Sequence, residues 1–290
     1  MYPAAFEYSA PVSLSEALSQ LADLGSDGRI LAGGQSLIPM MKLRLATPAH
    51  LIDINRLTDL AYVRRENGHL AIGALARHAD IVSSADVKAA SSMMASAAPW
   101  ISDPLVRNRG TLCGSVAHCD PEGDWNSVML ALGGSVVAVS SGGERTIPIG
   151  EFVVDFFTNS LQPNEMVKEV RVPVDGPSAG GTYLKLERKI GDYATVGVAV
   201  QLSLEGDKIA QAGIGLTSVD AHNIKATEAE KMLVGERPGP ELFASAAEVA
   251  ASSCHPSSDV RGPSEFKRAV VREYVLRGLQ SALEVARGEA

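Results

Sequence analysis

Two short glycine-bearing segments carry the residue types that could bind a phosphorylated ligand. The first contains Ala32, Gly33, Gly34, Gln35 and Ser36, and the second contains Gly110, Thr111, Leu112, Cys113, Gly114 and Ser115. Glycine lets the main chain approach a ligand and adopt positive φ, so that successive N–H groups converge on an anion. Serine and threonine hydroxyls add further donors. Together the segments predict a clamp for the pyrophosphate of an extended dinucleotide, although each one alone is also consistent with an ordinary turn.

The residue patterns of other common chemistries are missing from the sequence. There is no G-x-G-x-x-G after the first predicted strand, no P-loop pattern ending in Gly-Lys-Ser or Gly-Lys-Thr, and no C-x-x-C. The six histidines share no ligand spacing. We therefore expect neither a metal site nor a catalytic residue in this chain.

Composition and charge argue against several classes of function. The chain has 290 residues, of which 46% are apolar, enough for a large core in two domains or lobes. Its net charge of −8 argues against nucleic-acid binding, which needs a basic face. Three cysteines without tight spacing do not indicate a disulfide framework. No secretion signal and no apolar run of membrane-span length is recognisable, so we expect a cytoplasmic protein.

The first glycine loop must be positioned by a small N-terminal lobe, residues 1–56. Ser13 and Glu16 form a capping-box pattern for a helix that we expect to end at Gly25. The apolar segments 29–32 and 51–54 indicate short strands, with Ser36 as the N-cap of a helix between them. These elements predict a β-α-β arrangement after an initial helix.

The second glycine loop falls in a larger lobe, residues 57–175. The sequence predicts strands at 70–73, 135–139 and 166–172, and helices at 87–98 and 125–132. Glycines and a proline in residues 175–181 then indicate a linker.

The pattern changes after the linker and predicts a second domain, residues 176–290. Strands are expected at 182–186, 195–204 and 208–216, and helices at 227–233, 241–250 and 263–286. Three consecutive strands suggest an antiparallel sheet. Helices that follow them predict an α+β domain with the helices on one face of that sheet.

Longer stretches around the two loops resemble one known family. Residues 32–42 strongly resemble the first flavin loop of the FAD-binding medium subunits of the carbon monoxide dehydrogenase / xanthine dehydrogenase family, the molybdenum hydroxylases. Residues 109–115, followed by Asp120, Pro121 and Asp124, resemble the second flavin loop, and residues 189–195 resemble a third segment. The similarity covers nearly the whole chain in the right order.

The resemblance implies a fold. It is an α+β fold with a two-subdomain FAD-binding domain of the p-cresol methylhydroxylase type, residues 1–175, divided at about residue 56. A smaller C-terminal α+β domain follows, with a three-stranded antiparallel sheet and helices.

The resemblance also implies an oxidoreductase subunit. Its FAD would accept electrons from 2Fe-2S clusters of a small partner subunit and pass them to an external acceptor. A large partner subunit would carry the molybdenum cofactor, and the three chains would assemble as a dimer of heterotrimers. Residues 189–195 and 258–263 favour a carbon monoxide dehydrogenase-like member.

The resemblance assigns particular residues to FAD. Ala32 to Ser36 and Thr111 to Ser115 would bind the pyrophosphate and its neighbourhood. Asp124 would contact the ribose or adenosine part; alternatively, it caps a helix that starts at Trp125.

Three further residues are implied to lie near the isoalloxazine ring. Tyr193 would stack on it, Lys185 would stabilise negative charge on its reduced form, and Leu161 would cover it. The alternatives are a core strand start for Tyr193, a solvent-facing Lys185 and a core position for Leu161.

Some residues near the second loop are harder to assign. Cys113 stands where the family usually has glycine, so its side chain would restrict φ and add bulk. Arg107 and Arg109 could face the cofactor or pair with Asp103. His118 and Cys119 are expected to be packing or supporting residues.

The sequence leaves two other functions open. One is a stand-alone FAD-dependent oxidase or reductase with its own substrate pocket. The other is a binding module that has lost its flavin.

Overall fold

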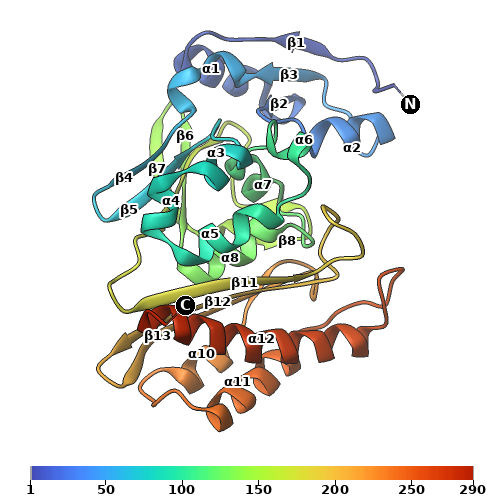
Figure 1. Ribbon diagram of the computed structural model, residues 1–290. Coiled ribbons are helices and arrows are strands. Elements are labelled where there is room, and N and C mark those ends of the chain that lie inside the picture. The colour runs from blue at the N-terminus through green and yellow to red at the C-terminus, as the bar shows by residue number, and fades with distance from the viewer. Residues whose placement is uncertain (1, 290) are drawn as a thin grey trace.

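The structure, a computed structural model, describes residues 2–289 and stacks them in three parts (Figure 1). A small sheet with two helices lies at one end, a five-stranded sheet with its helices in the middle, and a four-stranded sheet with the C-terminal helices at the other end. Three buried apolar clusters accompany these three sheets. The predicted two-domain α+β fold class is confirmed.

The first sheet is parallel, with strand order β1-β3-β2. Its strands are β1 (Glu7–Ser9), β2 (Gly28–Leu31) and β3 (His50–Asp53), and its helices are α1 (Leu14–Leu24) and α2 (Leu37–Leu43). The predicted β-α-β arrangement is confirmed, and β1 is an additional strand. The sequence did not reveal β1 because most of its side chains are exposed, so no apolar alternation marks it.

Helix α1 begins at the predicted cap, with one difference. The Glu16 N–H donates to the Ser13 hydroxyl at 3.2 Å. The Glu16 carboxylate accepts from the Val12 N–H at 2.9 Å, one residue before the position that a capping box requires. Gly25 ends the helix with a φ of +52°. Helix α1 packs on β2 and β3 and so supports the strand that leads into the first glycine loop.

The second sheet is antiparallel, in the order β4-β5-β10-β6-β7. Its strands are β4 (Val63–Glu66), β5 (His69–Gly73), β6 (Ser135–Ser140), β7 (Gly143–Pro148) and β10 (Met166–Pro173), and a small hairpin, β8 (Val153–Asp155) and β9 (Thr158–Asn159), lies beside it in the chain. The three central strands are the predicted ones. The edge strands β4 and β7 were not predicted because exposed polar and charged side chains, typical of sheet edges, dominate them.

Several short helices pack around the second sheet. They are α3 (His78–Ser83), α4 (Ala85–Ala90), α5 (Ser92–Ala97), α6 (Pro104–Arg107), α7 (Leu112–His118), α8 (Asp124–Leu132) and α9 (Ile149–Phe152), and 3-10 turns occur at η1 (Gly25–Asp27), η2 (Ile54–Arg56), η3 (Thr58–Leu60) and η4 (Ala98–Trp100).

The single helix predicted at 87–98 is divided into α4 and α5. Ser91 has an extended conformation with φ of −155°, which interrupts the helix. Its hydroxyl accepts from the Met94 N–H at 3.3 Å, and the Asp175 carboxylate accepts from the Ser92 N–H at 2.9 Å. The second helix therefore has its own N-terminal cap.

The third sheet is antiparallel, in the order β11-β12-β13-β14. Its strands are β11 (Ala179–Leu186), β12 (Val196–Glu205), β13 (Lys208–Thr217) and β14 (Ile224–Lys225), and its helices are α10 (Thr227–Leu233), α11 (Pro240–Ser252) and α12 (Ser264–Arg287). The three predicted strands are confirmed, and the short β14 makes a fourth. Although α12 has 24 residues, no helix within residues 2–289 is both long and apolar enough to cross a membrane.

The helices of the C-terminal domain cover one face of the third sheet, as predicted, and helices of the FAD-binding domain's part of the chain cover the other. Helices α10 and α12 cover the outer face with α11 packed against them, while α5 and α8 lie on the inner face (Figure 1). Main chains approach closely at Gly213 and Gly215, where a Cβ would collide with the carbonyls of Ala131 and Ser127 in α8. The C-terminal domain therefore lies directly against the helix that begins at Asp124.

Candidate functional site

The two predicted glycine loops are in direct contact. A Cβ at Gly33 would collide with the Arg109 carbonyl and would lie 2.7 Å from the Cα of Gly110 and 3.0 Å from the Thr111 nitrogen. Glycine permits this approach of two main chains because it has no Cβ. Residues 32–36 and 109–115 thus lie against each other at Gly33, and we call this region the loop junction.

The first loop offers main-chain donors. Gly34 has a left-handed φ of +73°. The N–H groups of Gly34, Gln35 and Ser36 donate no hydrogen bond within residues 2–289, whereas the Gln35 side chain donates to the Gly33 carbonyl at 3.3 Å. Ser36 is the N-cap residue of α2, as predicted, but its hydroxyl makes no capping hydrogen bond within the same residues. This hydroxyl is therefore available beside these main-chain N–H groups.

The second loop leads into α7. The Thr111 hydroxyl accepts from the Gly114 N–H at 3.1 Å and so caps this helix. The N–H group of Cys113 has no acceptor in the part of the chain that the structure describes. Ser115 lies on the same turn, half-buried. Both loops therefore present unused main-chain donors next to hydroxyl groups.

Cys113 fits the second loop without strain, although its side chain was expected to restrict φ and add bulk there. It is a helical residue without positive φ, so glycine is not required there. Its side chain is 2% exposed, and the thiol donates to the Ile72 carbonyl at 3.3 Å. Burial raises the pKa of this thiol far above its usual value. The Cys113 side chain is thus directed into the core, and only its main chain faces the site.

Two residues that the sequence did not reveal connect the loops. Arg77 donates from Nη1 to the Arg109 carbonyl and from Nη2 to Asn55 Oδ1, both at 2.6 Å. Asn55 Nδ2 in turn donates to the Ala32 carbonyl at 2.9 Å. Burial and the nearby Arg109 charge lower the pKa of Arg77. An isolated asparagine and an isolated arginine have no diagnostic spacing, so no sequence signal could have found this pair.

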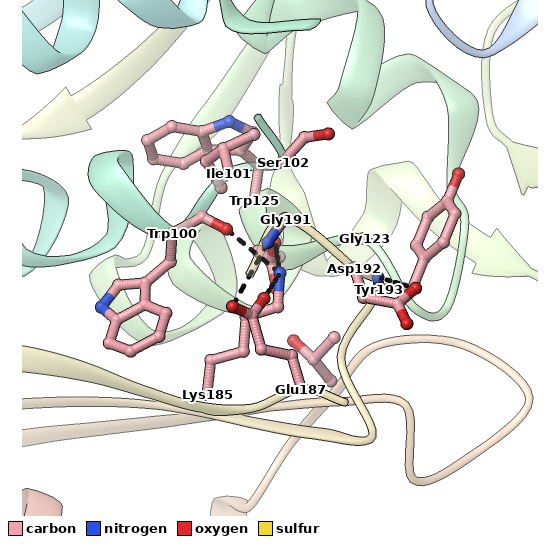
Figure 2. Close-up of polar contacts among 12 residues, drawn as sticks. Trp100, Ile101, Ser102, Gly123, Trp125, Lys185, Glu187, Gly191, Asp192 and Tyr193 are labelled. Carbon is pink, nitrogen blue, oxygen red and sulfur yellow. Dashed lines mark hydrogen bonds and ion pairs between the residues drawn. The ribbon is translucent and has the colours of Figure 1, made fainter. Parts of the chain in front are cut away.

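Lys185 is buried in an ion pair, so the solvent-facing alternative is wrong. Its Nζ lies 3.0 Å from Asp124 Oδ2 and 3.6 Å from Glu187 Oε2, and it donates to the Trp100 carbonyl at 3.1 Å. Figure 2 shows Lys185, Glu187 and Trp100 converging at this point. The structure thus brings two predicted flavin residues, Lys185 and Asp124, into direct contact.

Asp124 is the first residue of α8, not its cap. The N-cap position belongs to Gly123, which corrects the alternative assignment. Asp124 Oδ1 accepts from the Tyr183 hydroxyl at 2.6 Å, while Oδ2 accepts from Lys185. Burial raises the pKa of the Asp124 carboxyl, although Lys185 and Tyr183 oppose this shift. Both oxygens already have partners, so a contact with FAD would require one of them to accept a second hydrogen bond.

Tyr193 lies in the loop between β11 and β12, with 47% of its surface exposed. Strand β12 begins only at Val196, so the core-strand alternative is wrong for Tyr193. Leu161 is partly buried against the apolar cluster of the second sheet, and its N–H donates to Asn159 Oδ1 at 3.0 Å. The contacts of both residues with a flavin ring stay predictions.

Arg107 and His118, which lie near the second loop, make contacts within the protein. Arg107 donates from Nη1 to the carbonyls of Pro99, Ile101 and Ser102, at 3.3, 3.1 and 2.7 Å, so its proposed pairing with Asp103 is wrong. His118 packs on Phe157, with ring centres 4.8 Å apart. Among residues 2–289, no group of three or more His, Cys, Asp or Glu side chains is arranged to hold a metal ion.

A separate cavity of about 450 Å³ lies between the N-terminal end of α1 and strands β4 and β10. None of the predicted flavin residues lines it. Its charged groups are largely paired with one another: Arg64 with Glu66 at 3.0 Å and Arg171 with Glu169 at 2.5 Å. This cavity is therefore distinct from the loop junction.

The loop junction fits the pyrophosphate of FAD. Unused N–H groups from both loops, the positive φ of Gly34 and the Ser36 hydroxyl form the concentration of donors that an anion requires. Lys185 and Tyr193 belong to the C-terminal domain, where the first is buried against Asp124 and the second is partly exposed. Fold and site together define a two-domain flavin-binding protein.

Comparison with known proteins agrees with this class. The family described as "FAD binding domain in molybdopterin dehydrogenase" matches residues 4–175, and "CO dehydrogenase flavoprotein C-terminal domain" matches residues 181–282. The carbon monoxide dehydrogenase medium chain of Hydrogenophaga pseudoflava is 40% identical over 97% of this chain and 98% of its own. The 6-hydroxypseudooxynicotine dehydrogenase complex subunit alpha of Paenarthrobacter nicotinovorans is 38% identical over 99% and 97%.

A solved structure shows the same similarity. The structure of carbon monoxide dehydrogenase from Hydrogenophaga pseudoflava that lacks the Mo-pyranopterin moiety of the molybdenum cofactor superimposes with a TM-score of 0.94 at 41% identity. The match covers 97% of this chain and 98% of that chain. This chain belongs to the molybdenum hydroxylase family as a carbon monoxide dehydrogenase-like, FAD-binding medium subunit. It is thus an oxidoreductase subunit, and its cofactor is FAD.

Proposed function

We propose that this chain is the FAD-carrying electron-transfer subunit of a molybdenum hydroxylase complex. It accepts electrons from 2Fe-2S clusters of a small partner subunit and passes them to an external acceptor. A large partner subunit holds the molybdenum cofactor and binds the substrate. The observation that supports this most is the loop junction, where main-chain contact at Gly33 aligns unused donors from both loops.

The residues of this chain have distinct tasks in the proposal. Ala32 to Ser36 and Thr111 to Ser115 bind the pyrophosphate with their main-chain N–H groups and hydroxyls. Asn55 and Arg77 keep the two loops at the separation that this requires. Bound FAD supplies a carrier that accepts electrons singly and releases them singly or in pairs.

Further residues are proposed to surround the isoalloxazine ring. Tyr193 covers one face of the ring, and Leu161 covers the ring from the other domain. Lys185, held by Asp124, places a positive charge near it and favours the reduced, more negative form.

The substrate is proposed to be selected outside this chain. Relatives named for carbon monoxide and for 6-hydroxypseudooxynicotine are 40% and 38% identical to it, so the sequence of this chain is about equally similar to subunits from complexes with different substrates. We propose a carbon monoxide dehydrogenase-like complex, a dimer of heterotrimers located in the cytoplasm, in which the large subunit determines the substrate.

Isolation of the native complex tests this function. The chain, carrying an affinity tag, is purified under mild conditions, its partners are identified by mass spectrometry, and flavin absorbance is followed anaerobically after addition of substrate. We expect two further chains, one with molybdenum and one with 2Fe-2S clusters, and flavin bleaching only when all three are present.

Two results would contradict the proposal. If the chain alone, with FAD bound, oxidises a small substrate at a rate like that of the complex, it is a stand-alone oxidase or reductase. If denaturation of the purified complex releases no FAD, the chain is a binding module without flavin.

A further inference from the structure

One arginine of the C-terminal domain contacts two loops that border the proposed flavin site. Arg261 Nη1 donates to Glu122 Oε1 at 2.5 Å, and its Nη2 lies 3.9 Å from Asp192 Oδ1. Its guanidinium carbon is 6.0 Å from the centre of the Tyr193 ring. Glu122 precedes Asp124 at the start of α8, whereas Asp192 and Tyr193 belong to the loop between β11 and β12. Arg261 therefore joins the FAD-binding domain to the segment that carries Tyr193.

A rigid turn presents Arg261. The Asp259 N–H donates to the Gly262 carbonyl at 3.2 Å, and the Gly262 N–H donates to the Asp259 carbonyl at 3.1 Å. The Arg261 N–H donates to Asp259 Oδ1 at 2.8 Å. Gly262 has a φ of +149°, and a Cβ there would lie 2.9 Å from the Phe266 ring. Asp259 and Gly262 thus fix the main chain on both sides of Arg261.

A buried lysine fastens this turn to the domain core. Lys267 is 1% exposed, and its Nζ donates to Asp259 Oδ2 at 2.6 Å. Lys267 belongs to α12, which packs along the third sheet. Removing one partner of such a pair leaves an uncompensated buried charge, so the turn is strongly held. The position of Arg261 is therefore set by the core and not by the solvent-exposed surface.

Charge complementarity explains why an arginine occupies this place. Burial raises the pKa of Tyr193, and the charges of Asp120, Glu122 and Asp124 raise it further, whereas Arg261 lowers it. Within residues 2–289 the buried Arg261 Nε has no hydrogen-bond partner. Such an unsatisfied donor costs free energy, so the guanidinium is not placed to optimise its own hydrogen bonding.

We infer that Arg261 is a positioning residue of the flavin site: it holds Tyr193 at the isoalloxazine ring and fastens the C-terminal domain to the loop at Glu122. This inference rests on the proposed flavin site. The glycine loops belong to the FAD-binding domain. The turn 259–262 instead positions Tyr193, through Arg261, on the side of the site that the C-terminal domain forms.

The first test compares Arg261→Gln with Arg277→Gln in the full chain within its complex. Arg277 is a matched control, because it is an exposed arginine on α12 that pairs with Glu273 at 2.6 Å. FAD is removed and rebound, and its dissociation constant and absorption spectrum are measured. We expect Arg261→Gln to raise the dissociation constant on the order of tenfold, the usual size of coupling between separate sites, and to shift the spectrum. Arg277→Gln leaves both unchanged.

The second test asks whether Arg261 acts through Tyr193. In a Tyr193→Ala background, Arg261→Gln should cause no further spectral shift, because the ring it positions is gone. Arg261→Lys should show FAD affinity and an absorption spectrum between those of the wild type and Arg261→Gln. A lysine keeps the positive charge, but it has no planar guanidinium that can contact both loops. Glu122→Gln should reproduce the weaker FAD binding of Arg261→Gln. If Arg261→Gln folds poorly, Glu122→Gln takes its place in the test.

The outcomes separate this inference from the proposed function. If Arg261→Gln and Glu122→Gln bind FAD as tightly as Arg277→Gln and show the wild-type spectrum, the positioning role is refuted and the flavin site stands. If the spectral shift of Arg261→Gln persists in the Tyr193→Ala background, Arg261 does not act through Tyr193 and the inference fails. If the wild-type complex binds no FAD, both the inference and the proposed function fail.

Discussion

Lys185 and Asp124 form a buried ion pair between the two domains, with Nζ 3.0 Å from Oδ2. The two side chains are 1% and 7% exposed. Lys185 belongs to β11, and Asp124 begins α8, so one interaction connects the C-terminal sheet to the helix that lies against it. The positive charge of Lys185, which is proposed to act on the flavin, therefore also stabilises the contact between the two domains.

Replacing Lys185 by methionine should strongly destabilise the protein. Because Asp124 would remain as an uncompensated buried carboxylate, we expect the free energy of unfolding to fall by about 3–5 kcal/mol. Urea unfolding followed by circular dichroism measures this change. The exposed pair removed by Arg277→Gln should contribute less than about 1 kcal/mol. Similar losses in the two variants would show that the buried ion pair contributes no more to the free energy of unfolding than the exposed one.

A single methyl group at Gly33 should separate the two glycine loops. Gly33→Ala places a Cβ against the Arg109 carbonyl, and overpacking of this kind costs about 1–3 kcal/mol. We expect FAD affinity to fall at least about tenfold, and likewise for Gly34→Val, whose left-handed φ does not suit a β-branched residue. Equilibrium dialysis with FAD gives the affinity. Gly176→Ala is the control, because a Cβ there meets no atom within 4 Å; a loss of the same size in this control would remove the argument from loop contact.

Arg77→Gln should weaken FAD binding although it changes no residue of either glycine loop. The variant loses the hydrogen bonds to the Arg109 carbonyl and to Asn55, and charged hydrogen bonds contribute about 1.5–3 kcal/mol each. We expect an increase of about tenfold or more in the dissociation constant. Arg65→Gln, on the exposed edge strand β4, should bind FAD normally. Unchanged affinity in Arg77→Gln would mean that the loops keep their separation without it.

His78 should make stability depend on pH. Its Nδ1 accepts from the Trp125 indole N–H at 3.1 Å, and burial, with the charges of Arg107 and Arg77, lowers the pKa of His78 to about 4. The unfolded chain binds this proton near pH 6.5, so between pH 6.5 and about 4 the unfolded state holds a proton that the folded state does not. Stability is therefore complete above pH 6.5 and falls, by roughly 3 kcal/mol in total, as the pH drops toward 4.

The variant His78→Asn isolates this contribution. Asparagine can still accept from Trp125 but does not titrate, so the slope of unfolding free energy against pH should flatten between pH 6.5 and about 4. His69→Asn, at the exposed start of β5, should keep the wild-type slope. Denaturant unfolding at several pH values measures both slopes. A wild-type slope in His78→Asn would refute this explanation.

The parts of the site that the sequence reveals are the local ones. Glycines and hydroxyl residues at fixed spacing identify both loops, because nearest neighbours in the chain determine their conformations. Asn55 and Arg77 could not be found, because their contacts exist only after the fold has brought Ala32 and Arg109 together.

Burial at the domain boundary is also beyond sequence patterns. Alternation in a strand cannot show that Lys185 faces a second domain rather than water, because the covering helix α8 comes from an earlier part of the chain. For Cys113 the difficulty was orientation. Comparison with a glycine suggested strain, but a residue in the first turn of a helix needs no positive φ, and its side chain could turn toward the core.

The two family matches meet at residues 175–181, and the domains are joined by hydrogen bonds there. Asp175 accepts from the Ser92 N–H of the first domain at 2.9 Å and from Gln201 Nε2 of the second at 2.9 Å. At Gly213 and Gly215, sheet and helix touch main chain to main chain. Although two separate families match the two domains, the domains should be expressed together as one chain. Expressed separately, each domain would expose an apolar face that the other normally covers.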